Sequence, residues 1–167
     1  MRKNIIRNIS IILALVLAVA MFTACNQKPE ESSAELTTVG KLHVDIFKEA
    51  VKKSNNVDDI AQAFGENESI PYGLMCGPVI YEDGYMPGFD PNVDSAKFTQ
   101  VATFAPMIGS IPYVGYVFET NDTAALLKEL NEKAQLNWNI CTQADEIVSY
   151  VEGNKVLFVM TPSNLDE

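Results

Sequence analysis

Two runs of branched and aromatic residues near the end of the chain are separated by only two residues, and this spacing constrains the fold more than any other feature. The runs cover residues 146–152 and 155–161, and Gly153 and Asn154 lie between them. A two-residue connection joins antiparallel strands, and glycine suits the first central position of a type II′ turn because φ is positive there. The sequence therefore predicts a β-hairpin in an antiparallel sheet.

A second pair of strands is predicted at residues 98–105 and 113–120, which are also rich in aromatic and branched side chains. A Gly-Ser pair lies in the short connection between them, as in many hairpins. Residues 66–97, by contrast, are interrupted every few positions by Gly or Pro. Within that irregular region only residues 78–82 have the composition of a short strand.

Two helices are predicted before the irregular region. Residues 39–54 place apolar side chains on one arc of a helical wheel and charged side chains on the opposite arc. A shorter helix follows, with Asn55 or Asn56 as its N-cap and Gly65 as its C-terminal stop.

A third helix is predicted between the two strand pairs. Asn121 or Asp122 supplies its N-cap, and the helix is expected to extend to about Leu136, which falls on the polar side and lies past its end. Glu129 and Lys133 form a favourable i,i+4 pair. The order is thus helix, helix, irregular region, two strands, helix, two strands. This order favours an α+β fold, with an antiparallel sheet of about four strands and the helices packed on one face.

The first 24 residues have the layout of an export signal. Three basic residues, Arg2, Lys3 and Arg7, precede an uninterrupted apolar run over residues 11–22. A helix that spans a bilayer needs about 20 apolar residues, so this run is short for a permanent anchor. We expect residues 1–24 to be a cleaved signal peptide, with an uncleaved anchor as the alternative.

The end of this segment, Phe22-Thr23-Ala24-Cys25, resembles the bacterial lipobox, in which an apolar residue, a small residue and Ala or Gly precede a cysteine that is lipidated and becomes the mature N-terminus. The first position departs from the pattern, since leucine is usual there. The resemblance implies a lipid on Cys25 and a chain held at the cell membrane, facing outside the cytoplasm. An ordinary secretory signal with an unrelated cysteine is the alternative.

The mature chain is expected to contain one domain. Residues 25–38 carry almost no bulky apolar side chain and are predicted to form a flexible tether. Residues 39–162 form the α+β domain, and residues 163–167 form a tail. Residues 113–162, with an apolar strand, a helix and a Gly153-Asn154 turn into an apolar strand, resemble uncharacterised small lipoproteins of Gram-positive bacteria grouped as a domain of unknown function. That resemblance implies the fold and the location, and no activity.

The charge of the mature chain excludes several classes of partner. Removal of residues 1–24 leaves 9 Lys and Arg against 22 Asp and Glu, a net charge of −13. No arginine follows Arg7, although arginine is the residue best suited to bidentate binding of phosphate. Because nucleic-acid binding depends on the neutralisation of phosphates by Lys and Arg, we expect no nucleic-acid partner.

Catalytic candidates are few. His43 is the only histidine, and it lies in the middle of the apolar arc of the first helix, which predicts a buried, hydrogen-bonded core residue. The catalytic alternative is a small envelope hydrolase in which His43 acts with Cys76 or Ser110. Cys76 and Cys141 are either a disulfide or two free thiols.

No metal site and no cofactor are predicted. Asp90, Asn92 and Asp94 alternate like the start of a calcium-binding loop, but the sixth position lacks glycine and the twelfth lacks glutamate. We expect a solvated acidic loop over residues 82–94, with weak Ca²⁺ binding as the alternative.

The remaining candidates are apolar side chains in the irregular region, which either pack over the core or form a binding surface: Tyr72, Met75, Tyr81, Tyr85, Met86 and Phe89. The sequence predicts a lipid-anchored extracytoplasmic protein that is not an enzyme and binds another envelope protein or a small ligand. The alternatives are the small hydrolase and a structural envelope lipoprotein without a ligand.

Overall fold

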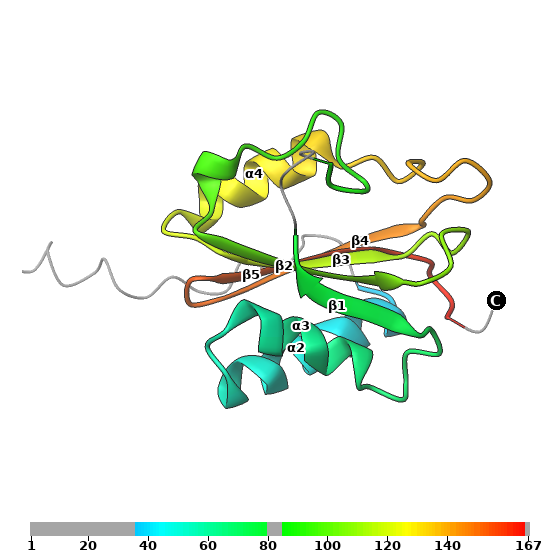
Figure 1. Ribbon diagram of the computed structural model, residues 1–167, viewed down its shortest axis with the longest axis horizontal. Helices are drawn as coiled ribbons and strands as arrows, with labels where there is room; N and C mark the ends of the chain where they lie inside the picture. Colours follow the sequence, from blue (N-terminus) through cyan, green and yellow to red (C-terminus); the bar gives the residue numbers. More distant parts are fainter. Residues whose placement is uncertain (1–35, 80–84, 166–167) are drawn as a thin grey trace, which may run out of the picture. The chain divides into compact units, whose positions relative to one another are not determined.

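The computed structural model describes residues 36–79 and 85–165, which form a five-stranded antiparallel sheet with helices on both faces (Figure 1). The signal peptide, Cys25 and most of the predicted tether lie outside these residues. In chain order the elements are α2 (Thr38–Lys53), α3 (Val57–Gly65), β1 (Leu74–Pro78), the short 3-10 helix η2 (Ser95–Lys97), β2 (Gln100–Pro106), β3 (Val114–Glu119), α4 (Thr123–Lys133), β4 (Glu146–Glu152) and β5 (Lys155–Thr161). The α+β class is confirmed, with five strands instead of about four.

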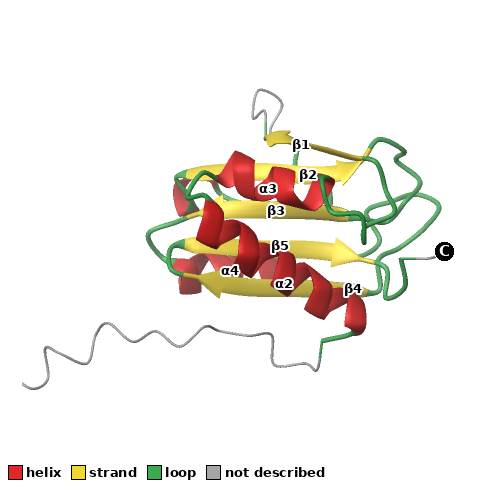
Figure 2. Cartoon of the chain, turned by 90° about the horizontal axis from the view of Figure 1, so that it is seen from below, coloured by secondary structure: helices red, strands yellow, loops and turns green. Residues whose placement is uncertain are grey.

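The strands lie in the order β1-β2-β3-β5-β4, and every neighbouring pair is antiparallel (Figure 2). Both predicted strand pairs are confirmed, and β3 and β5 join them at the centre of the sheet. In the last hairpin Glu152 pairs with Lys155, and Gly153 has a φ of +60°, as a type II′ turn requires.

The first strand differs from the prediction. It covers Leu74–Pro78 and not residues 78–82, of which 80–82 lie outside the described residues. Proline has no N–H to donate, so Pro78 would interrupt a central strand. Because β1 lies at the edge of the sheet and pairs only with β2 among the described strands, Pro78 is tolerated there.

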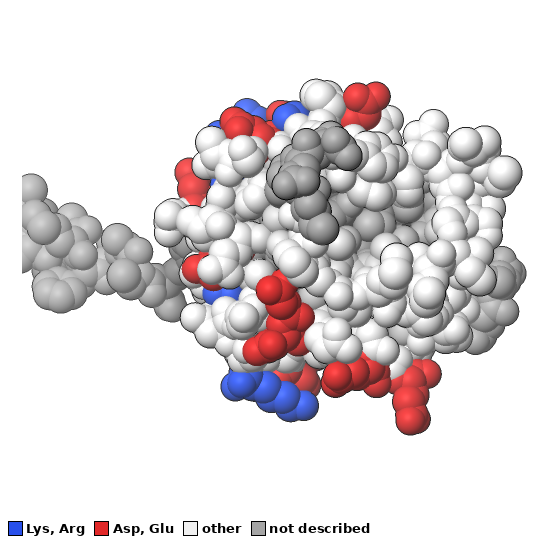
Figure 3. Space-filling model, in the orientation of Figure 1, with Lys and Arg blue, Asp and Glu red and all other residues white. Residues whose placement is uncertain are grey.

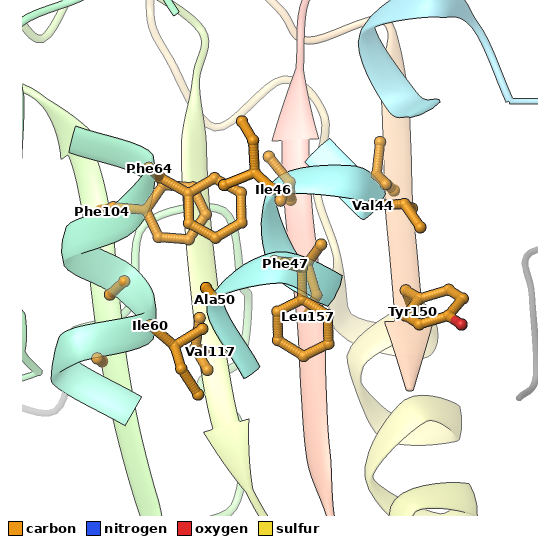
Figure 4. Packing of buried hydrophobic residues seen from close by; sticks show 14 of the residues in the cluster. Val44, Ile46, Phe47, Ala50, Ile60, Phe64, Phe104, Val117, Tyr150 and Leu157 are labelled. Atoms are coloured by element: carbon orange, nitrogen blue, oxygen red, sulfur yellow. The ribbon is translucent and has the colours of Figure 1, made fainter. Parts of the chain in front are cut away.

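Helices α2 and α3 cover one face of the sheet. Of the two candidate caps for α3, Asn56 is the cap, because its side-chain oxygen accepts a hydrogen bond of 2.7 Å from the backbone N–H of Asp58. The two helices bury their apolar arcs against the sheet in what we call the α2–α3 cluster (Figure 4). Its members include Val44, Ile46, Phe47, Ala50, Ile60, Phe64, Phe104, Val117, Tyr150 and Leu157.

Helix α4 lies on the opposite face, so the prediction that the helices share one face is wrong (Figure 1). Its apolar side chains Leu126, Leu127 and Leu130 pack in a second group of buried residues, the α4 cluster, with Phe158 and Met160 of β5. All seven residues of β5 are buried, on both faces of the sheet. A central strand of this kind needs cover on both sides, and α4 supplies part of it.

The ends of α4 follow the sequence signals only in part. Asp122 is the N-cap, and its carboxylate accepts a hydrogen bond of 2.9 Å from the N–H of Ala125. The predicted pair of Glu129 and Lys133 is confirmed at 2.6 Å. The helix ends at Lys133, earlier than expected, and Leu136 lies beyond it, as predicted.

Candidate functional site

His43 is fully buried between α2 and the sheet, and both of its ring nitrogens have partners. Nδ1 lies 2.7 Å from the carbonyl oxygen of Val39, and Nε2 lies 2.8 Å from the hydroxyl oxygen of Tyr113. A carbonyl only accepts, so Nδ1 carries the proton and Nε2 accepts from the Tyr113 hydroxyl. Burial lowers the pKa of His43 and raises that of Tyr113, which favours this neutral pair. The predicted core histidine is confirmed.

The candidate nucleophiles do not hydrogen-bond to this imidazole. Ser110 is exposed in the connection between β2 and β3. Cys76 is half-buried on β1, and burial raises the pKa of its thiol, which lowers the fraction of reactive thiolate. Since Val39 and Tyr113 occupy both nitrogens of His43, the imidazole has no free position from which to act as a base.

The two described cysteines are free thiols, so the disulfide alternative is not what the structure contains. Cys76 packs in the α2–α3 cluster against Gly65 of α3. Cys141 is exposed in the segment that connects α4 to β4. The two sulfurs therefore lie in different environments, one turned toward a helix and the other toward solvent.

Three of the six residues predicted as a binding surface are core or core-packed residues. Met86 is 0% exposed and Phe89 is 4% exposed, both in the α4 cluster. Tyr72 packs on the other face of the sheet, edge-on to Tyr113, with ring centroids 5.5 Å apart. For these three residues the alternative interpretation, packing over the core, is confirmed.

The other three do not form one surface either. Met75 and Tyr85 are 57% and 63% exposed, and Tyr81 lies outside the described residues. Only Tyr85 borders the hollow described next.

A hollow of about 300 Å³ lies between the β2–β3 connection and the segment after α4. In the described part of the chain its lining contains no charged side chain, and it includes Tyr85, Pro87, Ile108, Ile111, Trp138 and Ile140. In Figure 3 the hollowed part of the face is bordered by white atoms, whereas the basic side chains lie to the left and the acidic side chains lie to the left and at the upper and lower edges. This volume is at the lower end of the range for small-molecule sites, and the lining is apolar and aromatic, as in most such sites.

Two hydrogen bonds hold the walls of the hollow together. The side-chain amide of Asn139 donates to the carbonyl oxygen of Gly109 at 2.6 Å, and the hydroxyl of Thr142 donates to the carbonyl oxygen of Ser110 at 2.8 Å. Residues about 30 positions apart in sequence thus form one surface. Sequence periodicity could not pair them, because neither segment is helix or strand.

The rim of the hollow exposes large apolar side chains. Ile108 is 65% exposed and Ile140 is 99% exposed, and Met107 beside Ile108 is 73% exposed. Single exposed apolar residues are common, but a group around an uncharged hollow is typical of a contact surface. Together with the hollow, these three residues and Tyr85 are called the apolar end below.

A second hollow, of about 240 Å³, lies at the other end of the sheet, and its lining is polar and apolar in equal parts. It borders the first turn of α4, whose N–H groups are partly satisfied by the Asp122 cap. It therefore has no feature that distinguishes it from an ordinary surface depression.

The acidic loop uses its side chains for local hydrogen bonds. The side-chain oxygen of Asn92 accepts from the N–H of Met86 at 3.0 Å, and a carboxylate oxygen of Asp94 accepts from the N–H of Ala96 at 2.9 Å. Within residues 36–79 and 85–165, no three His, Cys, Asp or Glu side chains are grouped as ligands for a metal ion. Residues 82–84 of the predicted loop lie outside the described residues.

One buried charge was not predicted from the sequence. Lys155 of β5 is 1% exposed, and its ammonium lies 3.1 Å from the carboxylate of Glu119 and 2.8 Å from the side-chain oxygen of Asn55. A third hydrogen bond goes to the neighbouring Asn154. These contacts join the hairpin turn to the connection between α2 and α3, which is a structural role.

Comparisons of the chain with family models, with curated proteins and with solved structures find no match. The fold alone therefore defines the class of this protein, which is an α+β domain built on a five-stranded antiparallel sheet. None of the helices in the described part of the chain combines the length and the apolar character needed to cross a bilayer.

Proposed function

We propose that this chain is a lipid-anchored protein that faces outside the cytoplasm and binds a component of the cell envelope through its apolar end. The anchor is inferred from the export-signal layout of residues 1–24 and from the lipobox-like sequence before Cys25. Two acyl chains on that cysteine give stable membrane attachment.

The observation that carries the binding role is the uncharged hollow of an otherwise acidic chain. The chain has 22 Asp and Glu among its 167 residues, yet no acidic residue within 36–79 and 85–165 lines the hollow, and exposed Ile108 and Ile140 border it. A surface of this composition favours an uncharged, apolar group on the partner. Binding is preferred to hydrolysis because both nitrogens of His43 are occupied inside the core.

Two experiments test the proposal in a bacterial host. Mass spectrometry of the mature protein should find acyl chains on Cys25, and Cys25→Ser, which removes the sulfur that would carry them, should abolish this modification. A photo-crosslinking amino acid in place of Ile108 should capture an envelope component, while the same probe in place of exposed Ala124, on α4, should not.

The outcomes separate the alternatives. A mature protein without acyl chains on Cys25 would refute the lipid anchor. An anchored protein that gives no crosslink from position 108 would refute the binding role and leave a structural lipoprotein without a ligand.

A further inference from the structure

We propose that the partner of the apolar end is the membrane itself, so that the domain rests with this end on the outer leaflet to which it is anchored. The inference depends on the proposed lipid anchor and specifies what the apolar end contacts. It follows from where the chain enters the domain, from how far that point can lie from the anchor, and from the side chains presented there.

The chain enters the domain at the end of the sheet that carries the hollow. The N–H of Thr37 donates to Glu146 at 3.1 Å, and the Thr37 hydroxyl donates to the same carboxylate at 2.5 Å. Glu146 is the first residue of β4 and pairs with Thr161, the last residue of β5. The start of the described chain is therefore fixed at this end of β4 and β5.

The register of the other strands places the hollow at the same end. Val114, the first residue of β3, pairs with Met160, next to Thr161. Pro106, the last residue of β2, pairs with Leu74, the first residue of β1, at the same end of the sheet. Residues 107–113, which connect β2 to β3 and carry Met107 and Ile108, thus extend from the end of the sheet at which Thr37 is held (Figure 2).

The distance between the anchor and this point is limited. Cys25 and Leu36 are eleven residues apart, and eleven residues span at most about 40 Å even when fully extended. The lipid on Cys25 would therefore keep Thr37, and with it the apolar end, near the bilayer. The opposite end of the sheet, with the Gly153-Asn154 turn, lies one strand length from the end at which Thr37 is held.

The side chains at this end suit a lipid interface. Tyr85 and Trp138 are amphipathic aromatic residues of the type enriched at membrane interfaces, and Ile108 and Ile140 supply exposed apolar surface. Anionic lipids repel acidic surfaces, and the lining of the hollow has no charged side chain among the residues that the structure describes. Asp145, which is exposed near this end, accepts hydrogen bonds from the N–H and hydroxyl of Ser163.

Trp138 is the only tryptophan of the chain, so it reports on this contact without a label. The lipidated full-length mature protein is extracted from bacterial membranes and reconstituted in vesicles of phosphatidylethanolamine and phosphatidylglycerol. Some of the lipids carry a nitroxide quencher near the headgroup. The expected result is quenching of Trp138 emission and a shift of that emission to shorter wavelength. Both changes are measured relative to the same protein in solution without vesicles.

The matched variants add the same charge at the two ends of the sheet. Ile108→Asp with Ile140→Asp places two carboxylates on the apolar end and should abolish the quenching, because charged groups oppose insertion. Asn121→Asp with Ala124→Asp places two carboxylates on exposed positions at the start of α4 and should leave it unchanged.

Failure of this inference differs from failure of the anchor. If the protein is lipidated and vesicle-bound but Trp138 is not quenched, or if both pairs of substitutions give the wild-type quenching, the membrane contact is refuted and the anchor stands. Crosslinks from position 108 to a protein in place of lipid would also refute it. If the mature protein carries no lipid at Cys25, the proposed anchor fails first.

Discussion

Gly115→Ala should destabilise the fold strongly, because the aromatic ring of Phe104 lies directly over Gly115. The two residues are cross-strand neighbours on β2 and β3. A Cβ atom at position 115 would lie 2.1 Å from both Cε2 and Cζ of Phe104 and 2.7 Å from Cε1. Since ordinary contacts between carbon atoms are about 3.5–4.0 Å, the ring has to move by more than an ångström.

The surroundings of Phe104 make this movement costly. The ring is 0% exposed and stacks on Phe64 of α3, with centroids 4.1 Å apart and planes 8° from parallel. Overpacking of a core costs about 1–3 kcal/mol, and loss of an aromatic pair costs about 0.5–1.5 kcal/mol. The gain from alanine over glycine in a strand offsets about 0.5–1 kcal/mol. We expect Gly115→Ala to lower the free energy of unfolding by about 2 kcal/mol.

A double-mutant cycle tests this cause. Phe104→Leu removes Cε1, Cε2 and Cζ, the three atoms that the new Cβ would meet, so Gly115→Ala should be neutral or slightly stabilising in that background. Gly77→Ala is the matched control, because Gly77 also lies in a strand and a Cβ there has no atom within 4 Å. Its effect should stay within about 0.5 kcal/mol.

Urea unfolding followed by circular dichroism gives the free energies, provided that the m values of the variants agree. If Gly115→Ala costs no more than Gly77→Ala, the close approach of Phe104 is wrong. If the cost is the same in the Phe104→Leu background, the ring is not its cause.

Three further predictions concern ionisable side chains. Because burial lowers the pKa of His43, the unfolded chain binds a proton below about pH 6.5 that the folded chain excludes, so stability should fall as pH decreases from that value. Urea titrations between pH 7.5 and 5.5 should show this fall, and His43→Gln should reduce it. Lys155→Met should cost about 2–3 kcal/mol, since it leaves the partly exposed Glu119 without its cation, and the double change with Glu119→Gln should cost less in the same assay. In the native protein, a maleimide should label exposed Cys141 well before Cys76, whose thiol pKa is raised by burial, as followed by mass spectrometry.

Each of these has a contradicting result. An unchanged stability across the acidic range would place the histidine in contact with solvent. Equal costs for the single and double changes at the lysine pair would mean that the two charges are not coupled. Recovery of a peptide that joins the two cysteines would contradict the free thiols.

Local signals in the sequence predicted local structure well. The two-residue spacing around Gly153 gave both strands of the last hairpin at their observed bounds, and helical periodicity placed His43 in the core. These features depend on neighbours a few positions away, so a single sequence contains them. The edge strand was misplaced because Leu74–Pro78 has little β propensity and is held as a strand by pairing with β2.

Placement of the helices on the two faces depends on long-range packing, yet one signal was available. Residues 114–118 and 156–160 are apolar at almost every position, without the alternation of a sheet that has one solvated face. That pattern indicates burial on both sides, and α4 is the helix left to provide it. The sequence contained no comparable signal for the hollow, because Trp138 and Ile108, which both line it, lie in two separate irregular connections.

The contact between Thr37 and Glu146 determines how mechanical load would enter the domain. A pull exerted along the residues that precede Thr37 reaches β4 and the first turn of α2 together, because Thr37 donates two hydrogen bonds to the carboxylate of Glu146 and accepts from the N–H groups of Gly40 and Lys41. The force is then shared between a helix and the ladder of hydrogen bonds that joins β4 to β5. Unwinding of α2 from its N-terminal end therefore requires that the hydrogen bonds of Thr37 to the edge strand break as well as those within the helix.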